Sequence, residues 1–276
     1  MVKVFIATSL DGFIADKNGS VDFLYKYPEP SGEDMGYYNF MSTIDALVMG
    51  RKTFETVLGF GVEWPYTKPV FVTSSSEVYG KNISDSLKES DDRILGSPVT
   101  LRWSYSEAKA IDESLAYAYF VEKQLETRIV RFFNTVGPRQ LGAYGMVVPR
   151  FVKSALTDSP ITIYGDGNQT RCFAHVYDVI DAMVSIAFAE NTIGKVVNIG
   201  NNFEISINRL AQKIIDDTQS RSKIVYVSYQ EAYGDGFEDM ERRVPNIDLI
   251  KQLVGWEPMR DLSTIISDIS AEMKTD

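Results

Sequence analysis

The 276-residue sequence is poor in the residue types that build disulfides and zinc sites, because it contains one cysteine, Cys172, and one histidine, His175. A single cysteine excludes an internal disulfide, and one cysteine with one histidine cannot complete a Cys/His zinc site. We therefore expect no metal site, and a reducing cytoplasm as the location of the protein. We expect His175 to be a core or interface residue rather than a catalyst.

Long apolar runs and an excess of basic residues are also absent. No apolar stretch approaches the roughly 20 residues that span a bilayer. Asp11 interrupts the apolar stretch near the N-terminus, which favours a buried strand over a signal peptide. The chain carries 28 Lys and Arg against 38 Asp and Glu, for a net charge of −10. The missing apolar stretch predicts no membrane partner. Because phosphate contacts need a basic face, the acidic charge predicts no nucleic-acid partner.

The remaining pattern is that of a globular α/β protein, with 44% hydrophobic and 24% charged residues. We expect strands at residues 2–7, 46–49, 69–73, 127–133, 161–164, 196–199 and 224–227. We expect helices at residues 34–43, 51–58, 105–123, 147–156, 176–189, 207–219 and 262–273. Alternation of this kind favours a mostly parallel sheet covered by helices.

Seven short motifs follow one another over about 200 residues. They are SSSEVYG (74–80), YSEAK (105–109), RFFNTVGPR (131–139), IYGDGNQTR (163–171), NIG (198–200), RRVP (242–245) and GWEP (255–258). In this order they resemble the extended short-chain dehydrogenase/reductase family of NAD-dependent nucleotide-sugar epimerases, dehydratases and decarboxylases. The resemblance implies a Rossmann-like sheet with helices on both faces and a small C-terminal substrate lobe. It also implies dimerisation in a four-helix bundle through the helix at 105–123.

The YSEAK motif supplies the residues that the resemblance assigns to catalysis. Tyr105 would take the hydroxyl proton of the sugar while a hydride moves to NAD. Lys109, at i+4 on the same helix, would favour the ionised phenol by its charge and hold the nicotinamide ribose. Ser75, after the preceding strand, would hydrogen-bond the same oxygen.

Four further residues would contact the substrate. By resemblance to UDP-glucuronate decarboxylases, Glu77 is a catalytic carboxylate and Arg243 faces the carboxylate of a hexuronate. Arg171 would bind the diphosphate through its guanidinium, and Asn134 would contact the sugar–phosphate region. The alternatives are that Glu77 is a surface carboxylate and that Arg171 is a surface arginine.

The N-terminal part departs from this family, because the chain contains no GxxGxxG or GxGxxG phosphate loop. Its motifs SLDGFI (9–14), DALVMGRKTFE (45–55) and KPVFVTSS (68–75) instead resemble the dihydrofolate reductase-like domain of riboflavin biosynthesis. The resemblance implies that Arg51, Lys52 and Thr53 cradle NADPH phosphates at a helix N-terminus. The alternative is that Arg51 and Lys52 are solvated charges.

The two resemblances meet at the strand that ends in Ser74 and Ser75. We therefore predict a dihydrofolate reductase-like fragment at 1–75 fused to an extended short-chain dehydrogenase-like part at 76–276. Natural recombination, a laboratory chimera and a gene-assembly artefact all stay open as the origin.

Three functions follow as hypotheses. The first is an NAD-dependent epimerase or decarboxylase that acts on a UDP-sugar through a 4-keto intermediate, with activity impaired by the missing loop. The second is an NADPH-dependent reductase of the dihydrofolate or pyrimidinone type. The third is a non-catalytic nucleotide-sugar-binding chimera. The expected cofactor is NAD, with NADP as the alternative, and the expected assembly is a homodimer.

Overall fold

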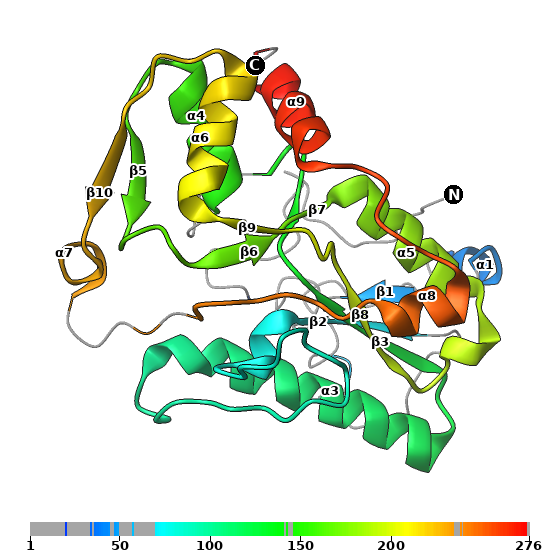
Figure 1. Ribbon diagram of the computed structural model, residues 1–276. Coiled ribbons are helices and arrows are strands. Elements are labelled where there is room, and N and C mark those ends of the chain that lie inside the picture. The colour runs from blue at the N-terminus through cyan, green and yellow to red at the C-terminus, as the bar shows by residue number, and fades with distance from the viewer. Residues whose placement is uncertain are drawn as a thin grey trace. The chain divides into compact units, whose positions relative to one another are not determined.

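The computed structural model describes residues 20, 34, 36–44, 47–49, 57, 70–140, 142, 146–234, 238 and 240–274 (Figure 1). The chain divides into two compact units, Met1–Leu47 and Val48–Asp276. The strand predicted at 2–7 and the helix predicted at 51–58 lie outside the described residues, except Val57, which is helical.

The first unit contains the short helix α1 (Tyr37–Ser42). Asp34 fixes its start, because its carboxylate accepts hydrogen bonds from the backbone N–H groups of Gly36 (3.0 Å) and Tyr38 (2.7 Å). The helix predicted at 34–43 is therefore confirmed, with a later start.

The second unit is built on a four-stranded sheet with the order β1-β2-β3-β8. Its strands are β1 (Leu47–Met49), β2 (Val70–Ser75), β3 (Thr127–Phe132) and β8 (Val196–Ile199). The pairs β2–β3 and β3–β8 are parallel. Most side chains of β2 and β3 are buried, as expected for a parallel sheet that is covered on both faces.

Helices lie on both faces of this sheet (Figure 1). On one face, α3 (Ser104–Lys123) packs its Ala116 against Val70, Val72 and Ile129. On the other face, α5 (Val176–Phe188) and α8 (Asp248–Val254) bury the alternate residues Phe71 and Val130. The alternation of strand side chains thus assigns each residue to one layer, and the predicted Rossmann-like α/β fold is confirmed.

A smaller lobe packs three helices against a two-stranded sheet. The helices are α4 (Val147–Leu156), α6 (Ile207–Thr218) and α9 (Leu262–Met273), and the strands β5 (Ile161–Tyr164) and β10 (Ile224–Val227) run parallel. Its core contains Val148, Phe151, Val152, Ile161, Ile163, Leu210, Ile214, Ile265, Ile266 and Ile269. This is the predicted C-terminal lobe.

Several short elements of the described chain were not predicted from the sequence. They are the 3₁₀ helices η2 (Ser76–Tyr79), η3 (Leu101–Trp103) and η4 (Glu190–Thr192), the strands β4 (Thr135–Val136), β6 (Thr170–Cys172), β7 (Ala174–His175) and β9 (Glu204–Ser206), and the helix α7 (Tyr229–Tyr233). Strand β4 pairs with β7 in parallel, and β6 pairs with β9 antiparallel.

Candidate active site

A cavity of about 960 Å³ opens at the carboxyl ends of β2 and β3, where open α/β sheets bind their ligands. Its size is that of small-molecule and cofactor sites. The residues that line it include the predicted site residues Ser75, Glu77, Tyr105, Asn134, Arg171 and Arg243. Side chains from both the sheet and the lobe therefore meet in one cavity, although they are far apart in the sequence.

Lys109 does not line this cavity. One helical turn after Tyr105, its ammonium donates a hydrogen bond to the carbonyl oxygen of Thr73 (2.8 Å) and lies 3.3 Å from the carboxylate of Asp112. Tyr105 itself lines the cavity and is half exposed. Helix α3 thus presents the tyrosine to the cavity and holds the lysine against β2.

Ser75 ends β2 and turns the chain into η2. Its hydroxyl accepts a hydrogen bond from the backbone N–H of Glu77 at 3.2 Å, so it caps this short helix. The Ser-Ser-Glu sequence therefore carries Glu77 directly from the sheet edge into the cavity.

The carboxylate of Glu77 lies between two guanidinium groups. Its Oε1 is 2.7 Å from Nη2 of Arg243, and its Oε2 is 2.5 Å from Nη1 of Arg102. Burial raises the pKa of Glu77, but the charges and hydrogen bonds of Arg243 and Arg102 outweigh it and lower the pKa below 4.5. Glu77 is therefore ionised at neutral pH, and with a side chain only 14% exposed it is not a surface carboxylate.

Arg171 lies on β6, where its guanidinium Nη1 donates to the carbonyl oxygens of Thr170 (2.8 Å) and Glu241 (3.4 Å). It is 9% exposed, so it is not a surface arginine. Asn134 follows β3 and donates from Nδ2 to the carbonyl oxygen of Cys172 at 2.9 Å. Both side chains are thus held by backbone oxygens at the cavity wall.

The cavity residues that were not predicted include Arg102, Arg150, Tyr164, Gln169 and Tyr229. The guanidinium of Arg150 lies 4.6 Å from the ring centroid of Tyr164, and Gln169 Nε2 donates to the hydroxyl of Tyr229 at 3.0 Å. Tyr164 and Gln169 stand inside the motif at 163–171, which could have indicated them. No motif contains Arg102 or Arg150.

A buried polar network lies directly behind the site. Glu113 accepts hydrogen bonds from Ser74 Oγ (2.5 Å), Arg131 Nε (2.9 Å) and Arg131 Nη2 (2.7 Å). Arg131 also donates to the hydroxyl of Tyr79 (2.9 Å), which donates to Asn198 Oδ1 (2.8 Å). Burial raises the pKa of Tyr79 to about 12, so this phenol stays protonated as a structural donor.

His175 is fully buried at the start of α5, where its Nδ1 accepts a hydrogen bond from the backbone N–H of Tyr177. It agrees with the expected core role. Among the residues that the structure describes, no group of three His, Cys, Asp or Glu side chains could hold a metal ion. The predicted NADPH-phosphate residues Arg51, Lys52 and Thr53, and the motif at 9–14, lie outside the described residues.

Comparison with known proteins identifies relatives of this chain. The model of a family described as GDP-mannose 4,6 dehydratase matches residues 36–269. UDP-N-acetyl-alpha-D-glucosaminuronate decarboxylase of Bacillus cytotoxicus is 41% identical over 192 residues, which are 69% of this chain and 59% of that protein. UDP-glucuronic acid decarboxylase 1 of Xenopus tropicalis is 32% identical over 241 residues, which are 87% of this chain and 53% of that protein.

Among solved structures, the UDP-glucuronic acid 4-epimerase from Bacillus cereus in complex with UDP-glucuronic acid and NAD matches with a TM-score of 0.65. It is 26% identical, and the match covers 75% of this chain and 62% of the epimerase. The chain thus spans little more than half the length of these relatives.

Proposed function

The chain belongs to the GDP-mannose 4,6 dehydratase family, and we propose that it is an NAD-dependent enzyme that acts on a UDP-sugar through a 4-keto intermediate, as a decarboxylase or a 4-epimerase. The observation that carries the proposal is the single cavity that gathers Ser75, Glu77, Tyr105, Arg171 and Arg243. The relatives named above, which act on UDP-linked acidic sugars according to their names, support this substrate class.

The described residues fit the reacting end of a nicotinamide cofactor. Ser75 and Tyr105 line the cavity at the carboxyl end of a parallel strand, and Lys109 is held at the same strand through the carbonyl of Thr73. In the proposal, Tyr105 and Lys109 hold the nicotinamide ribose, for which the ammonium of Lys109 has to leave the carbonyl oxygen of Thr73 and enter the cavity. The cofactor would supply a hydride acceptor for the sugar carbon. NADP is the alternative cofactor.

The protein's own residues would move the proton and hold the sugar. Tyr105 takes the proton of the C4 hydroxyl, and Ser75 donates a hydrogen bond to the same sugar oxygen. Oxidation at C4 of a hexuronate places a ketone β to the carboxylate, so the carboxylate can leave as carbon dioxide and its bonding electron pair forms an enolate between C4 and C5. The enolate would take up a proton at C5, and C4 would regain the hydride, so that no net oxidation results. Glu77 and Arg243 then serve as the groups that contact this end of the sugar.

The nucleotide end would lie toward the lobe. Arg171 binds the diphosphate, because a guanidinium offers paired donors to phosphate oxygens, and Asn134 contacts the sugar–phosphate region. Beyond them, Tyr164 and Arg150 offer a flat aromatic and guanidinium surface on which a base can stack.

Calorimetric titration of the full chain with NAD and with NADPH, each with and without UDP, tests the proposal. We expect NAD to bind and UDP to strengthen its binding, followed by conversion of UDP-glucuronate. Tyr105→Phe should abolish turnover and retain UDP binding. If no UDP-sugar is converted in the presence of added NAD, the proposed activity is wrong.

We propose further that residues 1–75 derive from a dihydrofolate reductase-like domain, with the boundary at 75/76. The motifs at 9–14, 45–55 and 68–75 support this origin. The family match begins at residue 36 and therefore includes the last two of these motifs. If residues 1–75 hold NADPH phosphates, replacing Arg51 and Lys52 by alanine should weaken NADPH binding. If the double variant binds NADPH as tightly as the wild type, Arg51 and Lys52 do not hold the NADPH phosphates.

The relatives do not favour the two other functions, the NADPH-dependent reductase and the non-catalytic binding chimera. The titration separates them: NADPH binding alone supports the first, and UDP binding without any dinucleotide supports the second.

A homodimer is the proposed assembly. On α3, Ile111 is 58% exposed and Leu115 is 37% exposed. In the predicted four-helix bundle, α3 of each chain would bury this apolar face against the other chain. Light scattering should therefore give twice the chain mass, and Leu115→Lys should shift it to the monomer.

Two further expectations remain predictions: the absence of a nucleic-acid partner and the cytoplasmic location. Within the described part of the chain, no helix has the length and apolar character that crossing a membrane requires.

A further inference from the structure

Arg102 faces the cavity from η3, three residues before Tyr105. Its guanidinium lies 2.5 Å from one oxygen of Glu77, while Arg243 lies 2.7 Å from the other. The three side chains are 22%, 14% and 8% exposed, respectively. One carboxylate is thus shared by two arginines inside the cavity, which leaves this cluster with a net charge of +1.

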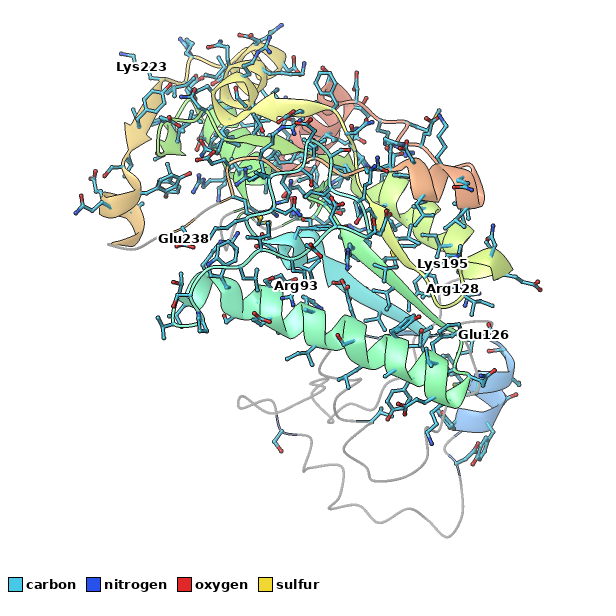
Figure 2. All side chains as sticks on the ribbon, turned by 60° about the horizontal axis from the view of Figure 1, so that its bottom comes forward. Arg93, Glu126, Arg128, Lys195, Lys223 and Glu238 are labelled. Carbon is cyan, nitrogen blue, oxygen red and sulfur yellow. The ribbon has the colours of Figure 1, made fainter. Side chains whose placement is uncertain are left out.

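The structure holds Arg102 in this place. Its guanidinium carbon lies 5.5 Å from the ring centroid of Trp103, which is 1% exposed. The indole of Trp103 donates to Glu238 at 2.8 Å, and Glu238 also pairs with Lys81 at 2.8 Å. Figure 2 shows Glu238 near the N-terminal end of α3. A guanidinium fixed on one side by a buried ring has less freedom to leave the cavity.

We propose that Arg102 is a specificity-determining residue that makes this cavity select a sugar bearing a carboxylate over the corresponding neutral sugar. This inference rests on the proposed function, since it names the substrate class of that same cavity. The ligand chemistry is a nucleoside diphosphate linked to a uronic acid.

The selectivity follows from the charges of Arg102, Arg243, Glu77 and the sugar. When a sugar carboxylate enters beside Glu77, two carboxylates face the two guanidinium groups of Arg102 and Arg243, and the cluster is neutral. Without Arg102, two carboxylates share Arg243, and like charges in a poorly hydrated site repel. A neutral sugar adds no charge, so the pair of Glu77 and Arg243 stays balanced with or without Arg102. Removal of Arg102 therefore penalises the acidic sugar selectively.

The test is calorimetric titration of the full chain with UDP-glucuronate, UDP-glucose and UDP. The wild type should bind UDP-glucuronate more tightly than UDP-glucose. Arg102→Met should weaken UDP-glucuronate about 10- to 100-fold, the range of a lost charge-assisted hydrogen bond, and UDP-glucose by less than about 3-fold. Arg102→Lys keeps the charge and should retain part of the preference.

Glu77→Gln supplies the opposite perturbation. With two arginines and no carboxylate, the cluster carries +2, and the preference for UDP-glucuronate should rise. In the double variant Arg102→Met with Glu77→Gln, Arg243 again faces a single carboxylate, so the preference should return toward the wild-type value. A charge effect predicts this reversal, whereas general damage to the cavity does not.

Arg93→Met is the matched control. Arg93 pairs with Glu107 of α3 at 3.2 Å, and neither residue lines the cavity. It should leave the affinity ratio unchanged. Circular dichroism of each variant reports folding. If Arg102→Met does not fold, the preference of Glu77→Gln for UDP-glucuronate over UDP-glucose tests the inference instead.

An unchanged ratio in Arg102→Met with UDP still bound would overturn the inference alone, as would equal loss of both UDP-sugars. Failure of the wild type to bind UDP would overturn the proposed function and this inference together.

Discussion

Replacement of Glu113 by glutamine should destabilise the fold strongly, although it changes one atom of a side chain. Glu113 is 8% exposed and Arg131 is 7% exposed. Both oxygens of Glu113 accept hydrogen bonds from Arg131, and Oε1 also accepts from Ser74. In the glutamine variant, an amide N–H₂ faces an arginine N–H, and the guanidinium is left without its counter-ion inside the protein.

Loss of one partner of a buried ion pair costs about 3–5 kcal/mol, because the other charge stays desolvated and unpaired. That is a large fraction of the roughly 5–15 kcal/mol by which native proteins are stable. Domains of roughly 150–250 residues lose about 2–4 °C in Tm per kcal/mol, so Glu113→Gln should lower Tm by about 6–20 °C. Thermal and urea unfolding followed by circular dichroism measure both quantities.

Glu257→Gln is the matched control, since Glu257 pairs with Lys251 at the similar distance of 2.6 Å. Both of these side chains are more than half exposed, so water already solvates them and we expect no measurable change in Tm. If Glu113→Gln and Glu257→Gln shift Tm equally little, burial does not govern the cost of breaking these pairs, and the reasoning is refuted.

Three further predictions concern the site and its surroundings. Arg171→Ala should weaken UDP binding about 10- to 100-fold by calorimetry, the range of a lost hydrogen bond to a charged group, and unchanged affinity would place the diphosphate elsewhere. The pKa of Glu77 is lowered on folding, so its ionised form stabilises the fold above the ordinary pKa of 4.5, and this contribution is lost as pH falls through the lower folded value. Urea unfolding should therefore show a steeper loss of stability for the wild type than for Glu77→Gln below about pH 4.5, and parallel pH profiles would contradict this. Burial raises the pKa of Cys172 to about 12, so the native thiol should resist labelling at pH 7 until guanidinium unfolds the chain, and rapid native labelling would disprove it.

The larger elements could be read from periodicity. Helices α4 and α9 and strands β5, β8 and β10 begin and end at the predicted residues. Short elements could not be found in this way, because strands of two or three residues such as β4 and β6 show no period. Strand β6 also depends on β9, which lies more than 30 residues later, so its existence is decided by tertiary pairing.

The candidate site also contains residues that the sequence predicted and residues that it did not. Ser75, Glu77 and Tyr105 stand in motifs whose chemistry is local, and the structure brings them to one cavity. Arg102 stands in no motif. Its ion pair with Glu77 depends on η3 lying beside η2, which the sequence alone does not indicate. The contacts of Lys109 with Thr73 and Asp112 could not be predicted either. The spacing of residues on a helix predicts which side chains share a face, but not which residues that face contacts.

The construction of the lobe has a consequence for synthesis on the ribosome. Its core joins α4 near residue 150, α6 near residue 210 and α9, whose Ile265, Ile266 and Ile269 are buried. While the chain emerges, the apolar face of α4 has no α9 to cover it until about 110 residues later, which takes about 5–20 s at typical elongation rates. Nascent chains of this protein should therefore expose Phe151 and Val152 for seconds and be clients of chaperones that bind apolar segments during translation.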